Sequence, residues 1–243
     1  MATRSQVVAE SRRVIRNLES VTVRTVSAAV SGLSGQSNQD IGGVYRTVAS
    51  GTLATLGNVA AQSAIDEYEA FREIASPTAP RYRPTKAVIS SEALIASSVG
   101  YGMSKVASGN LVSANAAFAV ALGRQVLQYY RETSVHNTQE DSFATGYQRV
   151  ASPTACAFCM TVALNEYTTF EESGGYHDDC NCSTVPIYNN QTAFRPSYYD
   201  EFEQDYNDFN EREVPEGYQF RELTSNNPGA ETFQAIRATT NRR

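Results

Sequence analysis

The sequence lacks the features that membrane-spanning and exported proteins need. It has no run of about 18 to 20 consecutive apolar residues, the length that a membrane helix requires. Its first residues, MATRSQVVAESRR, lack the apolar core of a secretory signal peptide. We therefore expect a soluble protein that is not exported by the usual route and that has no membrane partner.

Histidine is scarce, and this excludes most acid–base triads. The 243 residues include two histidines, and the sequence has no HExxH helix, no GxSxG turn and no glycine-rich phosphate loop. His136 lies among polar residues near the end of a predicted helix, where we expect a solvated or capping role. We predict no catalytic residue and no enzymatic activity.

A zinc deaminase is excluded by spacing. That chemistry requires His-x-Glu upstream and a proline joined directly to Cys-x-x-Cys. Here His136 is followed by Asn137 and Thr138. Pro153 lies three residues before Cys156. Both elements of the deaminase pattern are therefore missing.

Charge is unevenly distributed along the chain. Residues 1–165 hold 14 Lys or Arg and 11 Asp or Glu, whereas residues 166–243 hold 6 and 15. A part of charge +3 therefore precedes a part of charge −9, and the net charge is −6. The acidic pI near 5.1 argues against a dedicated duplex-DNA binder, because neutralising phosphates needs a concentrated basic face.

The first part of the chain has the apolar periodicity of helices. Apolar residues at helical spacing predict helices over residues 5–30 and about 41–75, and an alanine-rich stretch from about 91 to 136 predicts two more, divided near 108–110. We expect residues 1–141 to form a compact antiparallel bundle with a proline-rich loop at 76–85. Its larger core side chains are predicted to be Phe118, Leu122, Val126 and Tyr129. Arg12, Arg13 and Arg16 are predicted to lie on a basic face of the first helix.

The pattern changes after Asp141. GYQRVAS is typical of a short strand, PTACAFCMTVAL of a turn that enters a short helix, and NCSTVPIY of a second strand. We therefore predict a small α+β module over residues 142–188. The fold class is mainly α, with a helical bundle followed by this module and then a tail.

Residues 189–243 are polar and rich in acidic and aromatic side chains. They contain too few aliphatic residues to build a core of their own. We expect an extended or partner-bound tail that uses aromatic side chains as anchors. The expected anchors are Tyr198, Tyr199, Phe202, Tyr206 and Phe209. A tail without a partner is the alternative.

All four cysteines lie in a window of 27 residues, together with a histidine. Two thiols two residues apart, and a His-x2-Cys clasp further along, form the kind of ligand set that tetrahedral zinc binds. The predicted ligands are Cys156, Cys159, His177, Cys180 and Cys182. Because five residues compete for four places, one of the last two is expected to lie outside the site, and we favour Cys180 as the ligand.

A structural zinc ion is the preferred interpretation of this cluster. Two disulfides, or four thiols packed as small apolar groups, are the alternatives. Three thiolates and a neutral imidazole around Zn²⁺ would carry a charge of −1, for which Arg149 is a plausible neighbour. The zinc would contribute to the folding of a module that has little apolar mass.

Four short runs in this module carry a family resemblance. They are GYQRV at 146–150, CAFC at 156–159, YHDDCNC at 176–182 and TVP at 184–186. Together they resemble the Mu protein F-like (MuF) family of phage head morphogenesis and minor capsid proteins, in the form found in phages of actinobacteria. The resemblance covers about residues 142–188.

The resemblance implies a structural component of the virion. It implies a protein present in few copies, associated with the portal and the inside of the head, that acts in capsid assembly and in genome packaging or delivery. The implied partners are the portal protein and the major capsid or scaffold proteins, with possible contact to packaged DNA and possible homo-oligomerisation around the portal. The implied location is the virion, and the host cytoplasm during assembly.

Two other functions remain as alternatives. The first is a zinc-stapled nucleic-acid-binding protein, suggested by Arg12, Arg13, Arg16 and Arg24 near the N-terminus. The second is a metalloenzyme or toxin, which would need an open metal position and a proton-transfer residue that the sequence does not offer.

Overall fold

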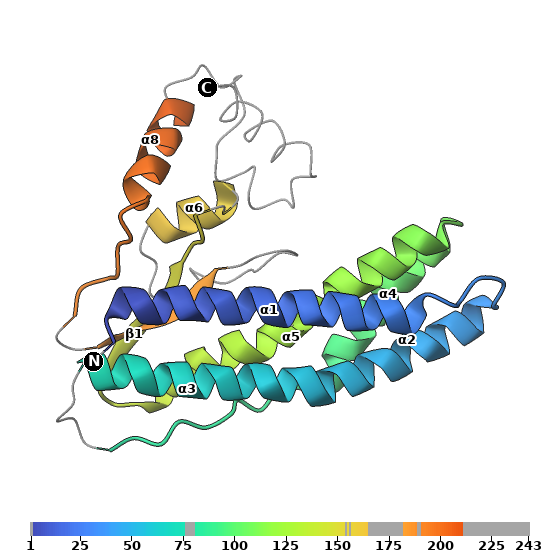
Figure 1. The fold of residues 1–243 in the computed structure, drawn as a ribbon, viewed down its shortest axis with the longest axis horizontal. Coiled ribbons are helices and arrows are strands. Elements are labelled where there is room, and N and C mark those ends of the chain that lie inside the picture. Colours follow the sequence, from blue (N-terminus) through green and yellow to red (C-terminus); the bar gives the residue numbers. More distant parts are fainter. Residues whose placement is uncertain are drawn as a thin grey trace.

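A computed structural model describes residues 2–75, 81–153, 155, 157–164, 182–188 and 191–210. The architecture is mainly helical, with one two-stranded sheet near one end (Figure 1). No helix within the described ranges is long and apolar enough to cross a membrane.

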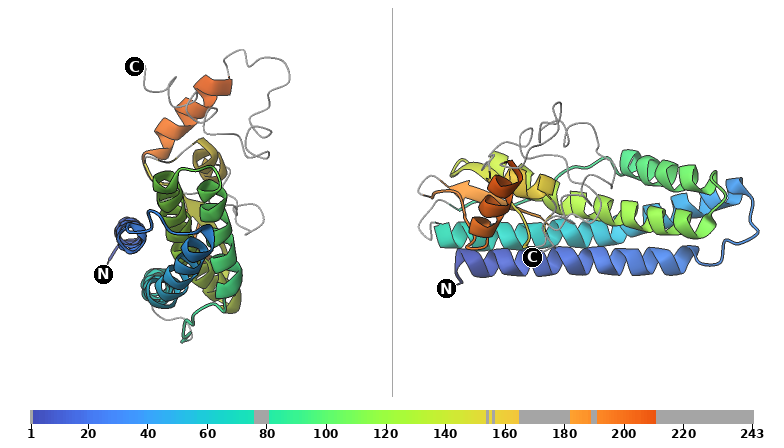
Figure 2. Two further views of the ribbon diagram at one scale, coloured as in Figure 1. Left: turned by 90° about the vertical axis from the view of Figure 1, so that its right-hand side faces the viewer. Right: turned by 90° about the horizontal axis from the view of Figure 1, so that it is seen from above.

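Five α-helices form the bundle, whereas the sequence predicts four, because one helix is expected over about residues 41–75. They are α1 (Arg4–Val30), α2 (Asn38–Thr52), α3 (Asn58–Ala75), α4 (Ser91–Val106) and α5 (Leu111–Glu140). A π-helical turn, η1 (Leu53–Gly57), joins α2 to α3, so these two form one nearly continuous rod. The long helix α5 packs against α1, α3 and α4, and thus occupies the centre of the bundle (Figures 1 and 2).

Polar side chains begin three of these helices. Thr3 and Gln6 form a reciprocal capping box at the start of α1, in which the Thr3 amide donates to Gln6 Oε1 at 2.8 Å. Ser37 Oγ accepts a hydrogen bond from the Asp40 amide, and Asn110 Oδ1 accepts one from the Ser113 amide. Each cap satisfies a backbone N–H that the helix itself leaves without a partner.

Close contact at the far end of the bundle depends on a glycine. The rings of Tyr45 and Phe118 stack at a centroid distance of 4.1 Å. Gly102 of α4 lies directly on them, because a Cβ atom there would come within 2.7 Å of Tyr45 and 2.9 Å of Phe118. Phe118, Leu122 and Val126 are buried as predicted, whereas Tyr129 is only partly buried and packs on Gly57.

Three residues separate the end of α5 from the small sheet. Strand β1 (Ala144–Val150) pairs antiparallel with β2 (Ser183–Tyr188), with Tyr147 opposite Pro186 and Gln148 opposite Val185. The short helix α6 (Ala157–Leu164) follows β1. Both strands and the short helix agree with the sequence prediction.

The described residues of the module share a core with the bundle. One buried cluster contains Val7 and Val8 of α1, Phe71 of α3, Val150 of β1 and Val185 of β2. Side chains far apart in the sequence therefore pack together at this end of the bundle. Bundle and module are joined by a shared apolar core as well as by the chain.

Part of the acidic segment is folded. Residues 199–210 form α8 (Tyr199–Asn210), although we expected an extended or partner-bound tail from residue 189 onward. Tyr199 and Phe202 are buried in the shared core, 1% and 4% exposed, so they anchor this segment to the chain's own module. Residues 211–243 lie outside the described residues, and so do the side chains of the two other expected anchors, Tyr206 and Phe209.

The predicted basic face of the first helix also needs correction. Arg13 and Arg16 are exposed, but Arg12 is buried, 8% exposed. Its guanidinium faces the module, where the carbonyl of Ala151 accepts a hydrogen bond from it.

Candidate functional site

The structure describes two of the five predicted metal ligands. Cys159 lies in α6 and Cys182 directly precedes β2; both are 1% exposed and belong to the shared core of bundle and module. Cys156, His177 and Cys180 lie outside the described residues. Within the described ranges, no group of three or more His, Cys, Asp or Glu side chains is arranged to hold a metal ion.

A buried arginine contacts one of the two sulfur atoms. Arg149, near the end of β1, is 2% exposed, and its Nη1 lies 3.9 Å from Cys159 Sγ. The positive charge of this guanidinium complements the negative charge that a cluster of metal-bound thiolates would carry. The sequence proposed Arg149 as a neighbour of the thiols, and this contact agrees with that proposal.

Three side chains converge on the backbone of Ala151, just beyond β1. Tyr199 Oη accepts a hydrogen bond from the Ala151 amide at 2.9 Å, and Tyr198 Oη donates to the Ala151 carbonyl at 2.8 Å. Arg12 of α1 donates to the same carbonyl at 2.8 Å and to Tyr198 Oη. The start of α8, the end of β1 and the first helix are thereby tied together beside the two cysteines.

These tyrosines remain neutral at ordinary pH. Burial raises the pKa of Tyr199, and the nearby Tyr198 and Cys182 raise it further. Burial also raises the pKa of Tyr198, although the guanidinium of Arg12 opposes this increase. The phenol groups therefore serve as fixed hydrogen-bonding groups.

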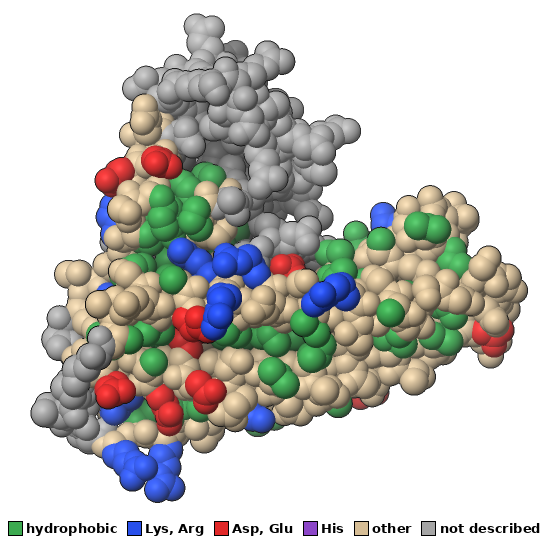
Figure 3. Space-filling model, viewed as in Figure 1, with side chains coloured by type: hydrophobic (Ala, Val, Ile, Leu, Met, Phe, Trp, Pro, Cys, Tyr) green, Lys and Arg blue, Asp and Glu red, His purple; other side chains and the backbone are tan. Residues whose placement is uncertain are grey.

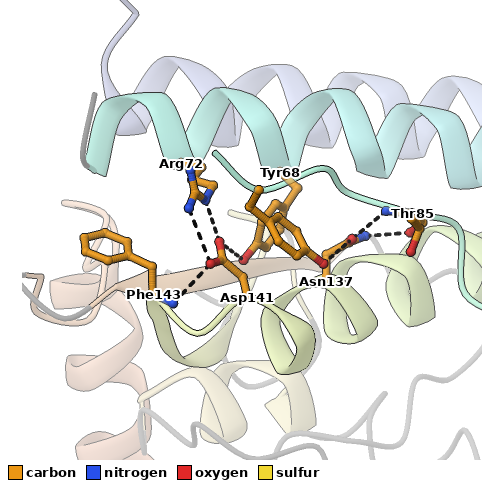
Figure 4. A network of polar contacts seen from close by, with 7 residues as sticks. Tyr68, Arg72, Thr85, Asn137, Asp141 and Phe143 are labelled. Atoms are coloured by element: carbon orange, nitrogen blue, oxygen red, sulfur yellow. Dashed lines mark hydrogen bonds and ion pairs between the residues drawn. The ribbon is translucent and has the colours of Figure 1, made fainter. Parts of the chain in front are cut away.

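A buried carboxylate marks the junction of bundle and module (Figure 4). Asp141, the residue after α5, is 3% exposed and accepts a hydrogen bond from Arg72 Nε at 2.6 Å. It also accepts from Tyr68 Oη at 3.2 Å and from the Phe143 amide at 3.1 Å. Helix α3, the end of α5 and the entry to β1 are thus joined through one side chain.

A buried amide holds the loop that follows α3. Asn137 Oδ1 accepts hydrogen bonds from Tyr82 Oη at 3.0 Å and the Thr85 amide at 2.8 Å. Its Nδ2 donates to the carbonyls of Thr85 at 2.8 Å and Thr133 at 2.7 Å. The side chain makes four hydrogen bonds, which pin the extended residues 81–90 along α5 (Figure 4).

Sequence reasoning missed both polar groups. The sequence pattern marks Asp141 only as the point where the helical periodicity ends, and Asn137 only as a departure from the deaminase motif. Their partners on α3 and on the loop that follows it are 52 to 73 residues away in the sequence. The one available signal was that both residues are polar and lie near the expected end of a helix.

Comparison with protein families identifies the chain. The sequence model of the VG15 protein family matches residues 1–209, which is most of the chain. The chain belongs to the VG15 family. The VG15 proteins are associated with phage virions, so this chain has a phage structural or virion-related role. Searches of curated proteins and of solved structures gave no match.

The VG15 match reaches every described element. It spans the bundle, the module with both described cysteines, and nearly all of α8. The residues that join these parts, among them Arg12, Asn137, Asp141 and Tyr199, therefore all lie within the family region.

One further buried carboxyl lies inside the bundle of this VG15 member. Glu67 of α3 contacts Tyr130 Oη of α5 through Oε2, while its Oε1 is buried. Burial raises the pKa of Glu67 to about 8; Ser11 opposes the increase by a hydrogen bond, and the negative charge of Glu10 adds to it. Glu67 is therefore mostly protonated at neutral pH.

Proposed function

We propose that this VG15-family chain is a minor capsid protein of the MuF-like head morphogenesis type. It is associated with the portal and the inside of the head, and it acts in capsid assembly and in genome packaging or delivery. The observation that carries the proposal is the VG15 match over residues 1–209, in a chain whose module also contains the MuF-like runs CAFC and YHDDCNC.

The way bundle and module are joined supports a mechanical role. Asp141 links the two parts by hydrogen bonds, and Arg12 links α1 to Ala151 and Tyr198. A hinge between them would have to expose Val7, Val150 and their neighbours to water. The bundle and module therefore act as one stiff adaptor that holds two partners at a fixed distance.

We further propose that the module is stapled by a structural zinc ion. Two observations support it: Cys159 and Cys182 are buried in the same core, and the guanidinium of Arg149 lies against the Cys159 sulfur. The ligands would be Cys156, Cys159, His177 and one of the last two cysteines. Because Cys182 shares a buried core with Cys159, we propose Cys182 rather than Cys180 as the fourth ligand. Bound zinc would hold these segments together and supply no reaction chemistry.

Elemental mass spectrometry with a free-thiol count tests the zinc proposal. We expect about one zinc per chain and thiols that react only after chelation. Cys159→Ser and Cys182→Ser should lose the metal, whereas Cys180→Ser should keep it. A fully loaded Cys159→Ser variant, or a metal-free protein with no free thiols, would show that the cysteines have another role.

Analysis of purified particles tests the capsid function. Quantitative mass spectrometry should find a few copies of the chain per particle. Protease should leave the chain intact in closed heads and digest it once the heads are opened. A chain that is missing from purified particles, or that is digested in closed heads, would contradict the proposal.

A further inference from the structure

Helix α1 presents a row of cations to solvent. Arg13, Arg16 and Arg24 are exposed, and Figure 3 shows Lys and Arg side chains lying over this helix. At 1.5 Å per residue the row extends over about 16 Å. Arg13 pairs with Glu10 at 2.6 Å, yet its side chain remains 67% exposed. The row is therefore open to an acidic partner.

Helix α8 carries the opposite charge. Its twelve residues include five Asp or Glu and no Lys or Arg. Asp200, Glu201 and Glu203 are exposed, and the carboxylates of Asp200 and Glu203 lie 3.5 and 2.7 Å from the Arg195 guanidinium. The first half of α8 thus presents three acidic side chains to solvent.

The anchoring of α8 turns this acidic surface outward. Tyr199 and Phe202 occupy the side of the helix that faces the shared core. At 100° per residue, Asp200 and Glu201 then point to the other sides. Beyond its first turn, α8 rises away from the bundle at the end where α1 begins (Figures 1 and 2).

We propose that the acidic face of α8 in one copy docks on the arginine row of α1 in a second copy. The two surfaces are complementary in charge, and they lie on different elements of the same chain. Each copy therefore offers one surface of each kind, and the contact is head to tail. Repeated head-to-tail contacts close into a ring or extend into a filament.

Salt and charge reversal test this contact in the full-length protein. Sedimentation velocity should show concentration-dependent association at 50 mM salt, weakened by about tenfold or more at 500 mM because exposed charges are screened. The double variants Arg16→Glu with Arg24→Glu, and Asp200→Arg with Glu201→Arg, should each be monomeric. All four positions are exposed, and circular dichroism would confirm that the variants fold.

Mixing the two double variants gives the decisive result. Each has one reversed and one native surface, so the mixture should associate again, while neither variant does so alone. Arg46→Glu, an exposed position on α2, is the matched control and should associate like the native chain.

Three outcomes would overturn the proposal. The first is a native chain that is monomeric at 50 mM salt and about 100 µM protein. The second is association that both double variants retain. The third is an arginine-reversed variant that keeps its oligomeric state but loses retention on duplex DNA, which would assign the row to nucleic acid.

Discussion

Replacing Glu67 by Gln should remove a large part of the pH dependence of stability. The Glu67 carboxyl has an ordinary pKa of 4.5 and a pKa of about 8 in the folded chain. Between these values the folded state binds a proton that the unfolded state has released. Stability therefore falls as pH rises from about 4.5 to 8, and this contribution is fully lost above that range.

The size of the effect follows from the two pKa values. Each pH unit between them removes about 1.4 kcal/mol, so about 3 kcal/mol is lost by pH 7, about 4 kcal/mol by pH 8 and about 5 kcal/mol well above pH 8. Glutamine has the same shape and stays neutral, so Glu67→Gln should match the native chain near pH 5. It should be more stable than the native chain by several kcal/mol at pH 9.

Urea unfolding at pH 5, 7 and 9 would measure this difference. Glu10→Gln is the matched control, because Glu10 is exposed and close to the same site. The control should change the pH profile only slightly. If native and Glu67→Gln proteins lost stability in parallel between pH 5 and 9, the argument that burial keeps this carboxyl protonated would be refuted.

Three further predictions concern packing, the junction and the C-terminal segment. Gly102→Ala should lower the melting temperature, at a cost of about 1 to 3 kcal/mol, whereas Gly100→Ala, where a Cβ meets nothing within 4 Å, should be neutral or stabilising in the same melt. Asp141→Asn should destabilise by about 3 kcal/mol in urea, because it leaves a guanidinium at the junction without its carboxylate; an unchanged midpoint would show that the ion pair contributes nothing. Deleting residues 211–243 should leave the melting temperature unchanged, whereas deleting residues 191–243 should lower it, because the second deletion removes buried tyrosine and phenylalanine; equal melting of both would contradict the anchoring of α8.

The helices and strands could be predicted from local patterns. Apolar residues at helical spacing located α1, and the breaks near residues 32–37 and 108–110 separated it from α2 and α4 from α5. The two strands followed from short apolar runs beside Gly and Pro. In each of these elements the residues that decide the structure are neighbours in the sequence.

The parts that could not be predicted depend on contacts across the chain. From the sequence, Arg12 belongs to a basic helix face. No residue near it in the sequence shows that the distant carbonyl of Ala151 accepts its hydrogen bond. The folding of residues 199–210 was missed for the same reason: Tyr199 and Phe202 are the only large apolar side chains described as buried in that helix, and they find their core in other elements.

The candidate site was predictable only as a set of residue types. Cysteine spacing identified the module, and the charge of a thiolate site suggested Arg149 as a neighbour. The junction made by Asp141 and Asn137 was invisible, because its partners lie on α3 and the following loop.

Because α5 leads almost directly into β1, a rotation of the sheet would also rotate the long central helix. Thirty residues of α5 extend over about 45 Å, and only three residues separate its end from the first strand. A rotation of about 10° at the sheet would therefore displace the far end of the helix by about 8 Å. A partner that shifts the module slightly would move the opposite tip of the bundle by more than the width of a side chain, so a contact at one end would displace the surface presented at the other.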